Sequence, residues 1–214
     1  MAYSLTQLGH VVRLSLPQFS FLVRGFMTEN ISSHSFSSSE SSIRGLVYIF
    51  TGAGKGKTSA ALGTVFRASG HGLRVYITYF MKGAYSYSER SILSKLPNVN
   101  MASFGQRELI DKTNIKPEEI EQARQALATS REAMLSGNYD LVVLDEVNLA
   151  VAWKLVELDE VIRLITDKPK NIELILTGRK ADVELVKLAD VVTEMLKIKH
   201  PYDKGIMARK GIDY

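Results

Sequence analysis

The chain has 214 residues, 45% of them hydrophobic, with a formal charge of +4 and a sequence pI near 9.2. This length is enough for one well-buried domain plus an appendage. The absence of cysteine excludes disulfides, thiolate metal sites and a cysteine nucleophile, and it fits a cytoplasmic location. The small positive charge is compatible with an anionic small molecule and is too weak to indicate a nucleic-acid partner. No apolar run reaches the ~18–20 residues of a membrane-spanning helix, so we predict no membrane span.

Residues 1–44 differ in composition from the rest of the chain. No acidic residue comes before Glu29, and a serine-rich stretch covers residues 32–42. Charged and polar residues interrupt the apolar part, which argues against a secretory signal. The composition resembles an organellar transit peptide, and the alternative is that translation naturally begins at Met27. Under either interpretation we expect a largely flexible N-terminal extension with a Ser-rich linker, followed by one folded domain at residues 45–214.

The most informative stretch begins with a short apolar run, residues 46–50, which predicts a buried strand. A glycine-rich segment follows it, and residues 60–68 then favour a helix. This is the arrangement of a phosphate-binding P-loop, although Thr51 stands where the usual pattern G-x-x-x-x-G-K-[ST] begins with glycine. The glycines let backbone N–H groups point at phosphate oxygens, Lys57 adds a positive charge, and the Thr58 hydroxyl can hold a divalent cation. The stretch therefore predicts binding of a nucleoside triphosphate.

Strands and helices alternate through the rest of the chain. We expect further strands at residues 75–80, 99–104, 141–144, 172–177 and 191–198. We expect helices at residues 88–96, 158–165 and 181–188, and a long one from Pro117 to just before Gly137. This alternation predicts an α/β fold with a mostly parallel six-stranded sheet and helices on both faces.

Charged side chains follow several of the expected strands. Lys82 follows the second strand, Asp145 and Glu146 follow the fourth, and Arg179 follows the fifth. Because open α/β sheets place their ligands at the carboxyl ends of the strands, we expect these side chains to lie beside the P-loop. An acidic residue there can reach Mg²⁺ directly or through water. The sequence has no Asn-Lys-x-Asp motif typical of GTPases, so these motifs indicate a small P-loop enzyme and leave its reaction open.

Several segments, in order, resemble those of the P-loop corrinoid adenosyltransferases. The loop resembles that family's loop, which also begins with threonine. The segments that carry the resemblance are Thr51–Thr58, Arg67–Gly72, Phe80–Gly83, Glu89–Arg90, Val142–Glu146, Leu176–Arg179, Leu188–Asp190, Thr193–Glu194 and, most specific of all, Lys199–Tyr214. Together they extend over roughly residues 44–214. The resemblance implies a single P-loop NTPase domain of RecA-like type.

The resemblance also implies a reaction. Such a protein transfers the 5′-deoxyadenosyl group of ATP to the Co(I) centre of a reduced corrinoid, cob(I)alamin or a related compound, in adenosylcobalamin biosynthesis or salvage. A cobalt–carbon bond forms and triphosphate leaves, so no Ser, Cys or His nucleophile is required. ATP as co-substrate, Mg²⁺ or Mn²⁺, a reductase that supplies electrons to cobalt, and a homodimer are expected with it. Two alternatives remain open: a small P-loop kinase or ATPase, and a non-catalytic carrier that binds ATP and corrinoid.

The resemblance implies a role for individual residues. The expected catalytic residues are Lys57, Thr58 and Glu146, and the expected metal ligands are Thr58, Asp145 and Glu146. The expected nucleotide contacts are Gly52, Gly54, Lys55, Gly56, Lys57, Thr58, Ser59, Arg67, Lys82, Arg90 and Arg179. Ala53 replaces an asparagine common in the family's loop. Residues 104–108 stand where some members have a Gly-Phe-Thr-Trp stretch that helps keep the corrinoid's lower ligand away from cobalt. The single tryptophan, Trp153, is expected in packing or in an interface.

Overall fold

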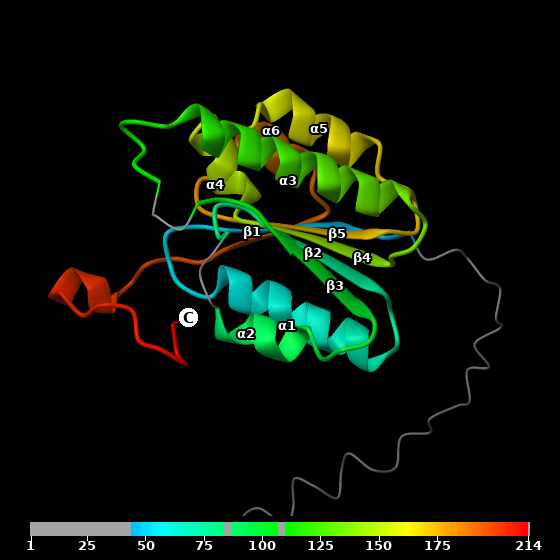
Figure 1. Cartoon of the computed structure of the whole chain (residues 1–214), viewed down its shortest axis with the longest axis horizontal. Coiled ribbons are helices and arrows are strands. Elements are labelled where there is room, and N and C mark those ends of the chain that lie inside the picture. The colour runs from blue at the N-terminus through cyan, green and yellow to red at the C-terminus, as the bar shows by residue number, and fades with distance from the viewer. Residues whose placement is uncertain (1–43, 84–86, 107–109, 214) are drawn as a thin grey trace, which may run out of the picture. The chain divides into compact units, whose positions relative to one another are not determined.

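The structure, a computed structural model, describes residues 44–83, 87–106 and 110–213, so the predicted N-terminal extension lies outside it apart from Arg44. Its centre is a six-stranded sheet (Figure 1). The strands are β1 (Val47–Thr51), β2 (Val75–Tyr79), β3 (Val99–Ser103), β4 (Leu141–Asp145), β5 (Glu173–Thr177) and β6 (Val191–Glu194). All neighbouring strands are parallel, and their order is β3-β2-β4-β5-β1-β6. The predicted α/β fold is confirmed, and the sheet is parallel throughout.

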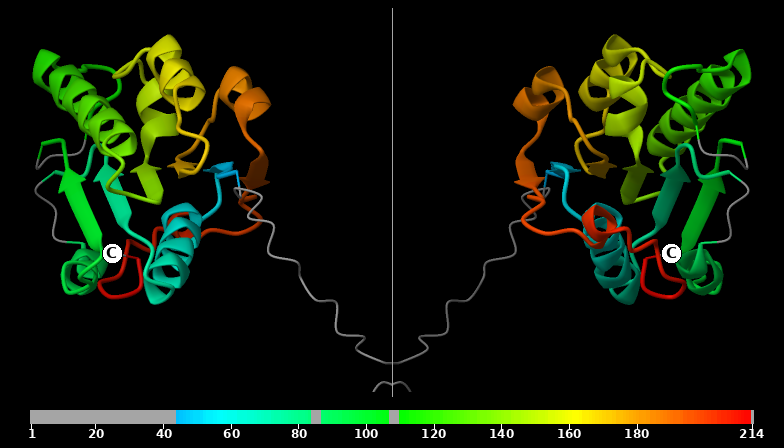
Figure 2. Two further views of the ribbon diagram at one scale, coloured as in Figure 1. Left: turned by 90° about the vertical axis from the view of Figure 1, so that its right-hand side faces the viewer. Right: turned by 90° about the vertical axis from the view of Figure 1, so that its left-hand side faces the viewer.

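Helices cover both faces of this sheet (Figures 1 and 2). α1 (Lys57–Gly70) and α2 (Ser88–Leu93) lie on one face. The other face carries α3 (Pro117–Leu135), α4 (Val147–Ala152), α5 (Leu158–Thr166) and α6 (Val183–Leu188). A short 3₁₀ helix, η1 (Pro201–Lys204), lies in the tail, residues 195–213, that follows β6. No helix among the described residues is long and apolar enough to cross a membrane.

Each helical layer packs its own hydrophobic core against the sheet. On the α1 side, Val65 and Leu93 pack with Ile77 of β2 and with Val143 of β4. On the other side, residues of α3 to α6 pack with Val142, Leu144, Leu174 and Leu176. β4 therefore places successive apolar residues on opposite faces, and all five of its residues are buried. A parallel strand covered on both faces is apolar along its whole length, which is why the pattern of β4 was readable in the sequence.

Two elements differ from the prediction. The sixth strand ends at Glu194 and not at Ile198, because the chain turns there to contact the glycine-rich loop: Met195 N donates to Thr51 O over 2.9 Å, and Gly54 N donates to Met195 O over 2.6 Å. α4 was not predicted. It begins directly after Glu146, which adopts a left-handed conformation with φ of 69°. Such a start carries no helix signal in the sequence, since non-glycine residues rarely adopt positive φ.

The register of the sheet brings four strand ends to one level. Tyr79 is paired with Asp145, and Phe50, one residue before the end of β1, is paired with Thr177, the last residue of β5. β5 lies between β1 and β4, so its carboxyl end separates the glycine-rich loop from the acidic pair. This edge of the sheet is where the predicted site residues converge.

Candidate nucleotide site at the carboxyl edge of the sheet

The glycine-rich loop between β1 and α1 has a shape that requires glycine. Gly52 has a φ of 95°, and a Cβ on it would lie 2.7 Å from the backbone nitrogen of Met195. A Cβ on Gly54 would lie 2.7 Å from the carbonyl oxygen of the same methionine. Gly56 has a φ of 111° and precedes the first residue of α1, so the loop turns directly into the helix N-terminus. The unpaired N–H groups and the dipole of a helix N-terminus make such a turn a site for anions.

Lys57 lies inside this loop. Its Nζ donates hydrogen bonds to Gly52 O at 2.9 Å and to Gly54 O at 2.7 Å, and the residue is only 7% exposed. Burial lowers the pKa of Lys57 below its ordinary value, although the nearby Glu146 carboxylate opposes that shift. The ammonium group is therefore held against the loop backbone, at the centre of the concave turn where a phosphate group would bind.

Asp145 is the most highly connected side chain of the site. Its Oδ1 accepts hydrogen bonds from Thr58 Oγ1 at 2.9 Å and from Thr177 Oγ1 at 2.6 Å. Its Oδ2 accepts one from Lys82 Nζ at 2.6 Å. Burial lowers the pKa of Lys82, but the charge and hydrogen bond of Asp145 outweigh it, so the pKa is raised. Three predicted residues, Thr58, Lys82 and Asp145, are thus brought together, and Thr177, which the sequence analysis did not select, joins them.

Glu146 lies beside this group with a different environment. Its backbone N–H donates to Thr177 Oγ1 at 3.0 Å, while its Oε2 is buried without a hydrogen-bond partner among the described residues. Burial raises the pKa of Glu146, and the neighbouring Asp145 raises it further. Gly178 allows β5 to approach this turn, because a Cβ there would lie 2.9 Å from Leu149 N. An unpaired buried carboxylate oxygen is costly, so this environment leaves Glu146 as a candidate for the cation ligand that the resemblance implies.

Aromatic rings surround the two basic residues that follow β2. The Arg90 guanidinium lies 4.6 Å from the ring centre of Tyr79 and 5.0 Å from that of Tyr87, and Lys82 Nζ lies 5.1 Å from the latter. Arg90 also donates from Nη2 to Lys82 O at 2.6 Å. Arg90 therefore fixes the backbone that carries Lys82, in addition to the nucleotide contact that the resemblance implies.

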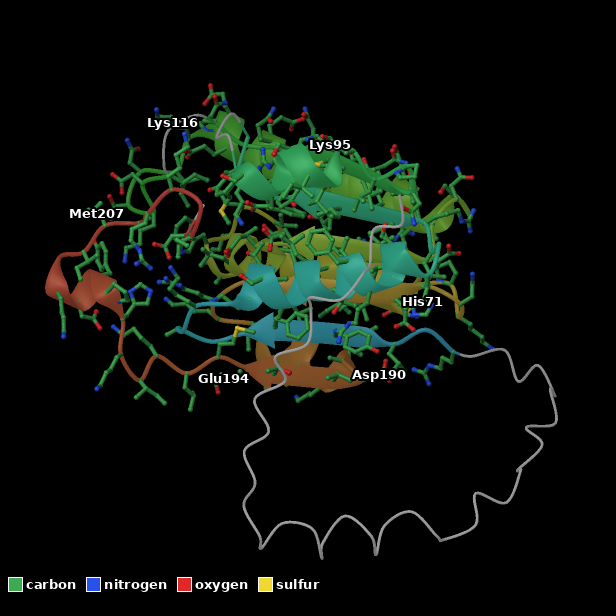
Figure 3. The ribbon with its side chains drawn as sticks, turned by 90° about the horizontal axis from the view of Figure 1, so that it is seen from below. His71, Lys95, Lys116, Asp190, Glu194 and Met207 are labelled. Atoms are coloured by element: carbon green, nitrogen blue, oxygen red, sulfur yellow. The ribbon has the colours of Figure 1, made fainter. Side chains whose placement is uncertain are left out.

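The fold places some of the remaining predicted residues near the loop and others away from it. Arg179 follows β5 and is close enough to lower the pKa of Lys57 electrostatically, while Lys55 and Ser59 lie exposed on the loop and on α1. Arg67 lies ten residues further along α1 than Lys57, about 15 Å at 1.5 Å per residue, so the structure does not bring it to the loop. His71, just beyond Arg67, lies on the opposite side of Figure 3 from Glu194 and Met207.

Two cavities adjoin the loop. The larger, of about 830 Å³, is lined by Ala53, Trp153, Arg179 and residues of α6 and β6. The smaller, of about 460 Å³, is lined by Thr58, Ser59, Lys82, and residues of α2 and of the tail. Within the described residues no three His, Asp or Glu side chains gather as a metal site.

The sheet is parallel, and a Gly-Lys-Thr turn joins its first strand to its first helix. An acidic pair ends the strand that is separated from the first by one intervening strand. This arrangement defines a P-loop nucleotide-binding protein. The family model described as "ATP:corrinoid adenosyltransferase BtuR/CobO/CobP" matches residues 43–214. The chain belongs to the ATP:corrinoid adenosyltransferase family, a family of transferases.

Named relatives support this membership. A corrinoid adenosyltransferase of Pseudomonas aeruginosa is 36% identical over 172 residues, which cover 80% of this chain and 84% of the relative. The corrinoid adenosyltransferase of Escherichia coli K12 is 34% identical over 171 residues, which cover 80% of this chain and 86% of the relative. The corrinoid adenosyltransferase CobA of Salmonella typhimurium has the same identity and the same coverage.

Proposed function

We propose that this protein transfers the 5′-deoxyadenosyl group of ATP to the Co(I) centre of a reduced corrinoid, in the formation of adenosylcobalamin. The observation that carries the proposal is the convergence of Lys57, Thr58, Lys82 and the acidic pair at the edge of the sheet in a member of this family. These groups are suited to gripping a polyphosphate. The proposed reaction requires no nucleophile from the protein, because the Co(I) centre of the corrinoid is the attacking atom.

The role of Lys57 follows from its present partners. Its ammonium group already lies against the loop, where it donates to two carbonyl oxygens. When ATP binds, those weak neutral acceptors are exchanged for anionic phosphate oxygens, which form stronger hydrogen bonds. The leaving triphosphate gains negative charge as the C5′–O bond breaks, and Lys57 together with the loop N–H groups stabilises that charge.

The environments of the two acids suggest different tasks. Asp145 is engaged by Thr58, Thr177 and Lys82, so it organises the site. Glu146 has a buried oxygen with no partner in the described part of the chain, and this makes it the better candidate to hold Mg²⁺ or Mn²⁺, together with Thr58, which contacts the adjacent Asp145. The residues present therefore fit a divalent cation. Such a cation, when bound, neutralises part of the charge on the triphosphate.

The reaction changes two bonds. The Co(I) centre of the substrate provides an electron pair to C5′, the C5′–O bond breaks, and triphosphate leaves with the bonding electrons. Holding the triphosphate in the loop fixes the position of C5′, and orientation of this kind can contribute about 7–11 kcal/mol. The protein's contribution is thus to immobilise one substrate and to stabilise its leaving group.

The accompanying assignments extend this proposal. We infer that residues 45–214 form the working domain and that a reductase supplies electrons to the cobalt. We also infer a homodimer and a cytoplasmic location, in line with the resemblance of the sequence to the family. A chain that begins at residue 42 should retain the adenosyltransferase activity of the full chain, and its molar mass by light scattering should be twice that of the monomer.

One assay tests the reaction. ATP, Mg²⁺ and chemically reduced cob(I)alamin are incubated with the protein, and both the light-sensitive cobalt–carbon product and free triphosphate are measured. Equal amounts of the two are expected. Release of ADP would instead indicate a kinase or ATPase, and tight binding of both substrates without product would indicate a carrier.

A further inference from the structure

The tail returns to the glycine-rich loop from the far end of the chain. Lys55 in the loop and Asp213 form an ion pair across 158 residues of sequence. Figure 2 shows the end of the tail, in red, beside the start of α1. The Asp213 side chain is only 8% exposed, whereas the preceding Ile212 is 72% exposed. The chain therefore turns this one carboxylate inward.

A local turn holds the Asp213 carboxylate in place. Its Oδ2 accepts hydrogen bonds from Arg209 N at 2.8 Å and from Arg209 Nε at 3.2 Å. The backbone N–H of Asp213 donates to Arg209 O at 2.8 Å. The Lys55 and Arg209 contacts together hold the pKa of Asp213 well below its usual range. Asp213 is thus ionised at physiological pH and shared by two cations.

The same turn forms one wall of the smaller cavity beside the loop. Gly211, Ile212 and Asp213 line that cavity together with Thr58 and Ser59, which open α1. A negative carboxylate thus stands next to a helix N-terminus and a loop suited to phosphate groups. A triphosphate that enters the loop would repel Asp213 and would offer the Lys55 ammonium a stronger anionic partner.

We propose that the Lys55–Asp213 ion pair is a clasp that closes the tail over the glycine-rich loop, and that a nucleoside triphosphate opens it by taking Lys55 from Asp213. The proposal rests on the function proposed above. In the closed state the Asp213 carboxylate is paired with Lys55. In the open state Lys55 is released toward the polyphosphate, and residues 209–213, still joined by the contacts between Arg209 and Asp213, leave the wall of the cavity.

The test measures ATP affinity and tail protection on the full-length protein. Calorimetry with ATP and Mg²⁺ compares the wild type with Asp213→Asn, and the variant should bind ATP about two- to five-fold more tightly, because no ion pair has to be broken. Hydrogen–deuterium exchange of the tail should speed up when ATP binds the wild type. In the variant it should be fast with or without ATP.

Three controls make the result specific. Asp203→Asn removes a tail carboxylate whose ion pair within the described residues is with the exposed Lys197, and it should change neither measurement. Asp213→Glu should restore part of the wild-type behaviour. In a Lys55→Ala background, Asp213→Asn should give a smaller gain in ATP affinity than it gives in the wild type, since the ion pair is already missing and only the repulsion between the carboxylate and the triphosphate is removed.

The outcomes separate this inference from the proposed function. If the wild type binds ATP but Asp213→Asn binds it equally or more weakly, or if ATP slows exchange in the tail, the clasp is overturned and the adenosyltransferase proposal stands. If the wild type does not bind ATP at all, both are overturned.

Discussion

Lys82 and Asp145 form a buried ion pair, with 2.6 Å between Nζ and Oδ2, at the carboxyl ends of the neighbouring strands β2 and β4. The two side chains are 13% and 2% exposed. This pair, together with the hydroxyls of Thr58 and Thr177, uses both oxygens of Asp145. Asp145 is therefore committed to its protein partners, whereas its neighbour Glu146 is not. The two adjacent acids should respond differently to mutation.

Glu146→Gln should reduce metal dependence without reducing stability. The change removes a buried charge whose Oε2 has no partner among the described residues, so the melting temperature should stay the same or rise. The Mg²⁺ concentration for half-maximal activity should increase at least about tenfold, because a cation ligand is lost. Activity measured across a Mg²⁺ titration and a thermal melt check both parts. A melting temperature that drops sharply would show that Glu146 supports the fold.

Asp145→Asn, in contrast, should reduce the stability of the fold. It leaves the Lys82 ammonium buried without its counter-charge, and breaking one partner of a buried pair costs about 3–5 kcal/mol. Chemical denaturation should show this loss in the free energy of unfolding. The double change Asp145→Asn with Lys82→Met should recover much of it, since neither charge remains. Failure of the double variant to recover stability would contradict the role assigned to the pair.

Lys57→Ala should abolish turnover while preserving the fold. The ammonium group donates hydrogen bonds to loop carbonyls and forms no ion pair within the described residues, so its removal breaks no buried ion pair. Loss of a positive group at the developing charge should lower the rate at least about 100-fold. The production of adenosylcorrinoid and a far-UV circular dichroism spectrum check activity and fold. Lys187→Ala, on the exposed face of α6, is the matched control and should be fully active; an active Lys57→Ala variant would remove the loop from the mechanism.

Thr177→Val should damage both stability and activity. The hydroxyl donates to Asp145 and accepts from Glu146 N, and the residue is completely buried. Valine has the same shape without the hydroxyl, so the hydrogen-bond partners of that hydroxyl are left unsatisfied. This should lower the free energy of unfolding by about 1–3 kcal/mol. Thr78→Val is the matched control, because Thr78 is equally buried and receives a hydrogen bond from Ser130. Both variants should lose stability, but only Thr177→Val should lose adenosyl transfer at a temperature where both remain folded.

Asp140 links stability to pH at the opposite edge of the sheet. It accepts hydrogen bonds from the backbone and the guanidinium of Arg74, and these contacts hold its pKa below the ordinary value. Its contribution to stability is therefore present above about pH 4, the unfolded value, and is lost as the pH falls through the lower folded pKa. Asp140→Asn should lower the melting temperature by a few degrees at pH 7, and the difference should shrink below about pH 4. A difference that persists unchanged at pH 2 would contradict this linkage.

The sequence predicted all six strands. The four central strands β2, β4, β5 and β1 are largely apolar and largely buried, as parallel strands inside a sheet are, whereas the edge strand β6 is exposed along its whole length. The sequence also brought Lys57, Thr58, Lys82 and Asp145 to one edge, since parallel strands end together. It did not predict α4, whose left-handed first turn has no local signal. Thr177 was missed because a polar residue at a strand end is common, and its importance depends on β5 lying between β1 and β4. The position of Asp213 depends on a return of the chain that no local pattern encodes.

The backbone contact between the loop and the chain just after β6 has a practical meaning for engineering. Gly52 and Gly54 pack closely against the backbone of Met195 and Leu196, so contacts with a segment distant in sequence help to define the curvature of the loop. A circular permutant opened between Glu194 and Met195 could keep every strand and both hydrophobic layers, yet its loop would relax. Ligand affinity and global folding should thus be separable in this protein by a single cut.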